Sequence, residues 1–176
     1  YREWWEASGT MSTIKVNEVQ HTGGTTSLTI DSSGRILQPT KPAFMARGNN
    51  NGYAQTTPIP FPSVDLNIGS HYNNSTYKFT CPVDGIYMFG ANVYYRCDAG
   101  ELALIRFMKN TSTNIGNYSS NTAGSGAAQQ QGTLHLTGLF HLSASDTVEV
   151  KFRDSGTPGD YYNGTTDSGF WGCLIS

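Results

Sequence analysis

Three aspartates near the end of the sequence are the residues best suited to hold a metal ion. Asp154, Asp160 and Asp167 lie in one turn-rich stretch. Carboxylate oxygens are ligands that Ca²⁺ prefers, and a Ca²⁺ site needs several of them to converge. The same stretch is rich in Gly, Asn and Ser, which tight turns require for their own geometry. The sequence therefore leaves two interpretations of these aspartates, a Ca²⁺ site or ordinary turn chemistry, and no other cofactor is expected.

Histidines and nucleophiles give a weaker case for chemistry. His135 and His141 share one face of a predicted strand, but six strand residues span about 20 Å, so the two cannot bind one ion within a chain. A ring of three copies on a symmetry axis is one alternative, and exposed or interface histidines are the other. The sequence contains no GxSxG, HExxH, P-loop or GxGxxG motif, and no acid pair for glycoside hydrolysis can be assigned. We therefore expect a protein that is not an enzyme.

Tyrosines in or beside polar loops are the best candidates for ligand binding. They are Tyr53, Tyr118, Tyr161 and Tyr162. Aromatic rings stack on sugar faces, and the amide-rich loops at 48–57 and 110–131 supply hydrogen-bonding groups. These features indicate recognition of a polar ligand such as a glycan, with ordinary solvated loops as the alternative.

The charge of the chain is low and nearly balanced. Only 14% of its 176 residues are charged, and the formal net charge is -2. This leaves no basic field for a phosphate backbone, so nucleic acid is not an expected partner. No apolar run approaches the ~20 residues of a membrane span, so no membrane insertion is expected.

Short segments of alternating apolar and polar residues are the main signal for secondary structure. The alternation is clearest over 86–96, 133–142 and 147–153. A period of two is typical of β-strands with one buried face. In contrast, residues 110–131 have almost no apolar content and are predicted to form a long exposed loop. The pattern predicts an all-β sandwich or barrel.

The three cysteines, Cys81, Cys97 and Cys173, are an odd number with no short spacing between them. This excludes a CxxC metal or redox motif. One disulfide with a spare thiol and three free thiols are the two alternatives, and a domain of this size does not need a disulfide in order to fold.

Composition divides the chain into three parts. Residues 1–10 carry Trp4 and Trp5 and are interpreted as a tag or a helical anchor. Residues 11–40 form a small β module that ends in a proline-containing linker, and residues 41–176 form the main domain. The strands of the module hold too few apolar residues to bury a core alone, so we expect the module to borrow a core from neighbouring copies or from a partner.

A spaced pattern of aromatic residues, Asn and Gly marks the main domain. Its members are Phe61, Asn67, Tyr72, Phe79, Gly85, Tyr87 and Phe89. This pattern resembles the signature of the C1q-like globular domain of the C1q/TNF superfamily, except that Ala91 stands where that family has Phe or Tyr. The resemblance implies a ten-stranded jelly roll of two sheets that assembles as a homotrimer. Some members of that superfamily bind Ca²⁺, so the resemblance makes Ca²⁺ an expected type of ligand.

The module at residues 11–37 has a resemblance of its own. Its segments 11–20 and 28–35 are similar to the N-terminal region of tail-fibre and other virion proteins of marine tailed bacteriophages. That resemblance implies an attachment or stalk segment that contacts other virion proteins. It also implies a place on the surface of a phage particle that is assembled in the host cytoplasm.

Together these features predict a non-enzymatic virion protein. It would be a trimeric phage fibre whose jelly-roll head binds a glycan or protein on the host surface, or another virion protein. A capsid-decorating trimer is one alternative. A secreted C1q-type ligand is another, although residues 11–40 contain no collagen-like Gly-X-Y repeat. A polysaccharide depolymerase has the weakest basis, because no acid pair can be placed.

Overall fold

The fold is seen in a computed structural model. It describes residues 14–48, 53–54, 58–124, 129–154, 160–162 and 167–176. The chain divides into two compact units, Tyr1–Thr40 and Lys41–Ser176. Every regular element among the described residues is a strand, as predicted. Within that part of the chain, no helix is both long and apolar enough to cross a bilayer.

The first unit contains a small antiparallel sheet. Its strands are β1 (Glu18–Gln20), β2 (Thr26–Ile30) and β3 (Ile36–Leu37), paired in that order. The turn from β2 to β3 forms because Asp31 Oδ1 accepts hydrogen bonds from the N–H groups of Ser33 and Arg35, both at 2.9 Å. Gly34 completes the turn with φ of 77°, which glycine adopts without steric cost.

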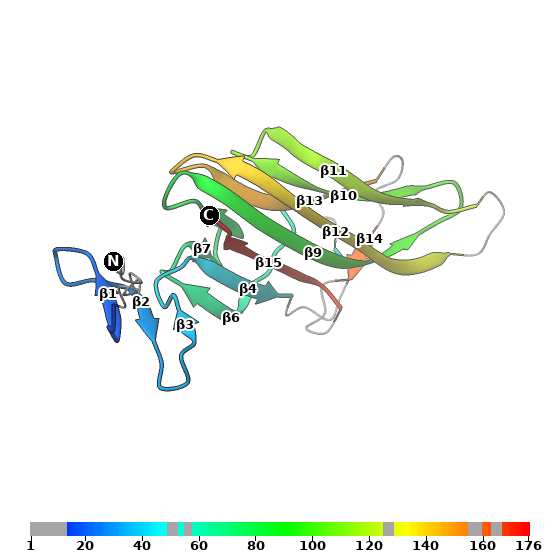
Figure 1. The fold of residues 1–176 in the computed structure, drawn as a ribbon. Coiled ribbons are helices and arrows are strands. Elements are labelled where there is room, and N and C mark those ends of the chain that lie inside the picture. The colour runs from blue at the N-terminus through cyan, green and yellow to red at the C-terminus, as the bar shows by residue number, and fades with distance from the viewer. Residues whose placement is uncertain (1–13, 49–52, 55–57, 125–128, 155–159, 163–166) are drawn as a thin grey trace, which may run out of the picture. The chain divides into compact units, whose positions relative to one another are not determined.

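The second unit is a sandwich of two antiparallel sheets (Figure 1). One sheet has the strand order β11-β10-β13-β8-β7 and consists of β7 (Tyr72–Asn73), β8 (Lys78–Thr80), β10 (Leu102–Lys109), β11 (Thr113–Thr122) and β13 (Thr147–Asp154). The other consists of β4 (Ala43–Arg47), β5 (Tyr53–Ala54), β6 (Ser63–Ile68), β9 (Gly85–Cys97), β12 (Gln130–Leu142), β14 (Asp160–Tyr162) and β15 (Gly169–Leu174). The long strand β9 pairs with β12 along one side and with β14 and β15 along the other.

The predicted jelly roll is confirmed. Strands β5 and β14 are short and pair with each other beside β9. The other ten described strands of the second unit form two layers of five. One layer has the order β12-β9-β15-β4-β6, and it faces the layer β11-β10-β13-β8-β7.

The prediction of a long loop over 110–131 is wrong for its middle part. Residues 113–122 form β11, which pairs with β10 from Leu102↔Thr122 to Lys109↔Thr113. An edge strand is stabilised by backbone hydrogen bonds on one side, so its side chains need not alternate. In β11 only Ile115 packs against the core, and this is why the sequence shows no strand period there.

Stacked aromatic rings fill the space between the two layers. The Phe44 ring lies 4.8 Å from Tyr72, 4.9 Å from Phe79 and 4.8 Å from Phe170, measured between centroids. Phe89 is 5.5 Å from Phe79 in an edge-on arrangement. Offset and edge-on pairs of this kind contribute beyond the area they bury. Each of these rings is buried, so the aromatic stack is the centre of the core.

Two polar or small residues of the aromatic pattern shape the corners around that core. The side chain of Asn67 bridges a turn, since its Nδ2 donates to Tyr72 O at 2.8 Å and its Oδ1 accepts from Tyr72 N at 3.0 Å. A Cβ on Gly85 would lie 2.6 Å from Ser176 O, so no side chain fits there. Ala91 is buried directly opposite Phe170, and the fold is formed with this small residue in place.

Candidate functional site

Several exposed apolar side chains of the sandwich lie on the seven-stranded sheet. The face of this sheet that points away from the five-stranded sheet is here called the outer face. In one row across it, Trp171 pairs with Gly90 on one side and Met45 on the other, and Met45 pairs with Leu66. Met45 and Leu66 are 41% and 45% exposed. Trp171 is half-buried, so this row is an apolar stripe that meets solvent.

A second row continues the stripe. Met88 pairs with Cys173 and with Leu139, which is 64% exposed. The row on the other side of Trp171 is polar and contains His135, Asn92 and Arg47. The outer face is therefore apolar over two rows and bordered by polar side chains.

Gly90 is a packing position on the outer face. A Cβ at this residue would overlap the six-membered ring of Trp171. The indole therefore lies flat over the backbone of β9, where only glycine leaves room for it. This arrangement spreads the Trp171 ring over the sheet surface as part of the stripe.

A cleft opens at the edge of the sandwich, where β11 and β12 of opposite sheets meet. Its volume is about 220 Å³. Its lining is Phe107, Gly116, Asn117, Leu136, Thr137, Gly138, Leu139 and Phe140. A Cβ on Gly116 or Gly138 would press into the Phe140 ring, so the two glycines make room for that half-buried ring. Leu139 belongs both to this cleft and to the outer face.

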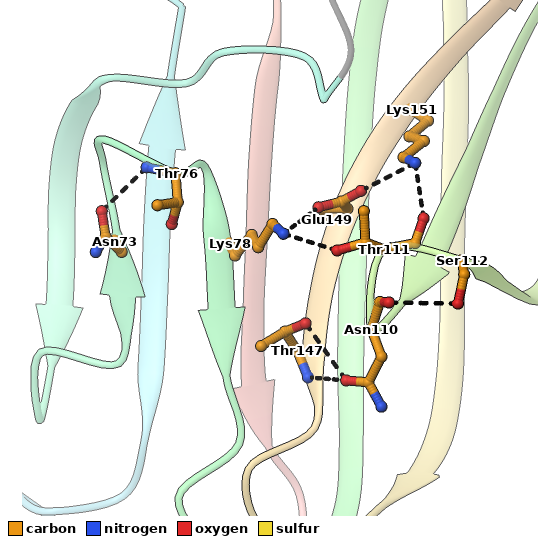
Figure 2. A network of polar contacts seen from close by, with 9 residues as sticks. All are labelled: Asn73, Thr76, Lys78, Asn110, Thr111, Ser112, Thr147, Glu149 and Lys151. Atoms are coloured by element: carbon orange, nitrogen blue, oxygen red, sulfur yellow. Dashed lines mark hydrogen bonds and ion pairs between the residues drawn. The ribbon is translucent and has the colours of Figure 1, made fainter.

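A buried carboxylate lies on the opposite sheet. Glu149 of β13 is 1% exposed, and the Nζ atoms of Lys78 and Lys151 lie 3.2 and 3.4 Å from its two oxygens. Each lysine also donates to Thr111, one to Oγ1 and one to the carbonyl O, both at 2.7 Å. Figure 2 shows the two lysines reaching Glu149 and Thr111 together. Among the described residues, no group donates a hydrogen bond to the Glu149 oxygens.

The turn that holds Thr111 is fixed from its other side. Asn110 and Thr111 have φ of 49° and 68°, a region that β-branched residues seldom adopt. Asn110 Oδ1 accepts from Thr147 N at 2.8 Å (Figure 2). Asn110 Nδ2 donates to Asp146 at 2.9 Å. The network thus joins the β10–β11 turn to β8 and to the start of β13. Its lysines and carboxylate therefore tie three parts of the five-stranded sheet together.

Asp146 is the most strongly perturbed carboxyl of this region. Lys109 Nζ lies 2.7 Å from its Oδ2, which also accepts from Ser143 N at 2.9 Å. These hydrogen bonds, the one from Lys109 first, lower the pKa of Asp146 to about 2. Nearby, burial and then the charge of Asp146 raise the pKa of the Cys81 thiol to about 12. Cys81 is therefore not a nucleophile at neutral pH.

A model of the C1q domain matches residues 43–175. The chain belongs to the C1q domain family. The resemblance of the spaced aromatic pattern to the C1q-like domain is therefore confirmed. In the structure, the residues of that pattern form the aromatic stack, the Asn67 turn and the Gly85 corner. The family match begins at residue 43, so it says nothing of the module at 11–37, whose resemblance to phage proteins stays a prediction.

Curated relatives of this C1q domain are complement C1q tumor necrosis factor-related proteins. Protein 3 of Mus musculus is 29% identical over 128 residues, which cover 73% of this chain and 50% of the relative. Protein 2 of Homo sapiens is 31% identical over 137 residues, which cover 77% of this chain and 45% of the relative. The chain thus spans about half the length of the curated relatives it matches.

Solved structures agree on the fold. The globular domain of zebrafish complement 1qA superposes with a TM-score of 0.59 at 22% identity and covers 77% of this chain and 98% of its own. The Eiger TNF from S. frugiperda gives a TM-score of 0.62 at 12% identity, covering 78% of this chain and 94% of its own. At these identities the likeness shows the C1q/TNF fold and nothing further.

The three aspartates proposed for Ca²⁺ lie at strand ends or beside undescribed residues. Asp154 ends β13 in the five-stranded sheet, and Asp160 begins β14 in the seven-stranded sheet. Asp167 follows the undescribed residues 163–166, and its carbonyl accepts from Asn92 Nδ2 at 3.1 Å. Over the described part of the chain, no cluster of three His, Cys, Asp or Glu side chains could hold a metal. The Ca²⁺ interpretation remains a prediction.

The four tyrosines proposed for ligand binding have different positions. Tyr161 is fully buried, and its ring packs 5.4 Å from Phe152, so it supports the core and presents no ring to a ligand. Tyr118 on β11 is 60% exposed. The backbone of Tyr162 pairs with Tyr53, and the side chains of both lie outside the described residues. Tyr118 is thus the member of the set that the structure shows on the surface.

The three cysteines are free thiols, with Cys81 and Cys97 buried and Cys173 half-buried. The structure therefore agrees with three free thiols and not with one disulfide and a spare thiol. Sequence reasoning missed the outer face and the Glu149 network. Met45 and Trp171 do lie next to the buried Phe44 and Phe170 in the sequence, but the outer face becomes visible only once their strands are placed side by side. No signal marks Glu149, which sits at an outward position like any solvated glutamate.

Proposed function

We propose that this C1q domain assembles as a homotrimer and acts as a non-enzymatic binding head. The observation that carries the proposal is the apolar stripe on the outer face, where Met45, Leu66 and Leu139 are all at least two-fifths exposed. Contiguous apolar surface of this kind marks an interaction site in soluble proteins. C1q/TNF-like folds commonly form homotrimers, and that supports identical copies as the partners.

Two different surfaces on one chain, the apolar outer face and the cleft at the sandwich edge, favour a ring over a two-fold dimer. A two-fold contact uses the same patch on both copies, whereas a closed ring joins one patch to a different one. The outer face and the cleft between β11 and β12 are such a pair. Leu139 belongs to both, so the two patches lie side by side at the β12 edge. Copies related by a three-fold axis would place the edge of one against the outer face of the next.

The names of the relatives support a C1q-type ligand as the biological role. In this role the trimer presents its loops to a receptor or glycan, and three weak contacts act together at one effective concentration. Tyr118 is the exposed aromatic side chain that we assign to this contact. We also propose that the protein is secreted in this role.

A phage fibre is the second candidate, and the module at residues 11–40 favours it. That segment contains a three-stranded sheet and no Gly-X-Y repeat, so it is not a collagen-like stalk. In this role the module would contact other virion proteins, and the head would bind the host surface or decorate the capsid. Immunogold labelling of purified particles and of cell-free medium separates the two candidates, since each predicts the label in one fraction.

The trimer is tested by light scattering coupled to size-exclusion chromatography on the full chain. Leu66→Glu places a charge in the stripe, and Val83→Glu is a matched control that lies on the β8–β9 connection and is 47% exposed. We expect the wild type and Val83→Glu to elute with about three times the chain mass of 19.1 kDa, and Leu66→Glu to elute as a folded monomer. A monomeric wild type at micromolar concentration would overturn the proposal.

A further inference from the structure

The small sheet of the first unit has two chemically different faces. Directly opposed residues of antiparallel strands share a face. Val19 is opposite Leu28, and Ile30 is opposite Ile36. Leu28 and Ile30 are two positions apart on β2 and share a face as well. These four aliphatic side chains, one or two from each strand, form what is here called the module face.

The other side of the same sheet is polar and satisfies its own groups. Glu18 Oε2 accepts hydrogen bonds from Gln20 Nε2 at 2.7 Å and from Thr26 Oγ1 at 3.0 Å. A bulge between Val19 and Gln20 brings Thr26 to this side. Leu37 is opposite Thr29 and lies on the polar side, next to Glu18. Glu18, the charged residue of the three strands, therefore lies on the side away from the module face.

The module face is not covered. Val19 and Ile36 are 48% and 65% exposed, and Leu28 and Ile30 are only partly buried. Units of fewer than about 40 residues need a disulfide, a metal or oligomerisation in order to be stable. The first 40 residues contain no cysteine for a disulfide, and among the described residues no group of three His, Cys, Asp or Glu side chains could hold a metal. We therefore consider oligomerisation as the source of the missing core.

We propose that the module face packs against the module faces of other copies of this chain, so that residues 14–37 form a second self-association element. The inference rests on the proposed head trimer, which supplies three copies at once. Residues 38–42 join module to head and span at most about 18 Å. Tethers this short hold modules at an effective concentration on the order of millimolar. Because the four strand residues of the module face are all aliphatic, identical faces can meet without charge repulsion between them.

Three modules packed in this way form one closed unit. Twelve aliphatic side chains, four from each copy, point toward a common axis, and the Glu18 side of each sheet stays in water. The arrangement gives the short strands the core that they lack individually.

Amide hydrogen exchange in the full chain tests this directly, read by mass spectrometry on peptides that cover β2 and β3. The backbone N–H of Ile30 donates to Asn17 O at 2.7 Å and reports on the sheet. Ile36→Asp charges the module face, and Leu37→Asp is the matched control on the neighbouring residue, 47% exposed on the opposite side. We expect exchange in wild type and Leu37→Asp to be more than about tenfold slower than in Ile36→Asp. All three proteins should keep the mass of a head trimer.

Other outcomes overturn the inference in distinguishable ways. Trimeric wild type without protection in residues 26–37 overturns it and leaves the proposed function standing. Protection that persists in the monomeric Leu66→Glu variant shows that other copies do not cover the face, and also overturns it. A monomeric wild type overturns both proposals. Oxidation of Ile36→Cys and Leu37→Cys is a second readout, in which the inference requires interchain disulfides in the first variant at more than about tenfold the level of the second.

Discussion

At the scale of single residues, Asp146 is a carboxyl group whose ionisation makes the stability of the fold depend on pH. Its carboxylate accepts hydrogen bonds from Lys109, Ser143 and Asn110. The pKa of about 2 lies below the ordinary value of 3.8, so the folded state holds the ionised form more tightly than the unfolded state does. The contribution of Asp146 to stability is therefore present above about pH 4 and is lost as the pH falls through about 2.

The first prediction follows from the lowered pKa of Asp146. Asp146→Asn should lower the free energy of unfolding at pH 7 by about 1–3 kcal/mol, the range for a hydrogen-bonded charged group. It should also flatten the fall in stability between about pH 4 and pH 2. Urea denaturation at a series of pH values measures both effects, and the exposed Asp98 provides the control Asp98→Asn. An unchanged acid slope in Asp146→Asn would show that other carboxyls cause it.

At the scale of elements, the Glu149 network joins three parts of the five-stranded sheet. Lys78 comes from β8, Glu149 and Lys151 from β13, and Thr111 from the β10–β11 turn. The carboxylate is buried and is paired by charge alone among the described residues. A buried charge is costly when its partners are removed. Removal of Glu149, in contrast, leaves two partly exposed lysines that keep their hydrogen bonds to Thr111. The two lysines, rather than the glutamate, are expected to be indispensable.

The second prediction compares these changes. Lys78→Met with Lys151→Met should destabilise the protein by about 2–4 kcal/mol, below the upper end for fully buried pairs because both lysines are partly exposed. Glu149→Met should cost less than about 1 kcal/mol. Adding it to the double lysine variant should restore most of the loss. Denaturation midpoints at one protein concentration give the comparison, and a larger cost for Glu149→Met alone would contradict it.

The same elements show what the sequence could predict. Alternating strand patterns predict an all-β sandwich or barrel. The spacing of Phe61, Tyr72 and Phe79 carries the family resemblance that implies the two-sheet jelly roll. Strand β11 could not be predicted, because its pairing with β10 uses backbone groups and only Ile115 reaches the core. The Glu149 contacts join residues far apart in the chain and depend on the final packing. The two patches proposed for assembly, likewise, are visible only once strands are placed side by side.

At the scale of the whole molecule, assembly and stability become one property. If the outer face is buried between copies, the folded state is a trimer and unfolding releases three chains. A tenfold rise in protein concentration then stabilises each chain by about 0.9 kcal/mol, which is two-thirds of the 1.4 kcal/mol that corresponds to a factor of ten. A monomeric head gains nothing from concentration, so the melting temperature distinguishes the two.

The third prediction is therefore a shift in Tm. For a chain of 176 residues, about 0.9 kcal/mol corresponds to a rise of about 2–4 °C for each tenfold increase in concentration. We expect this rise in scanning calorimetry of the wild type and of Val83→Glu, and a constant, lower Tm for Leu66→Glu. Leu66→Glu does not disturb the aromatic core, since the residue is 45% exposed on the outer face. A wild-type Tm that does not depend on concentration would mean that the stripe of Met45, Leu66 and Leu139 faces something other than another copy of the chain.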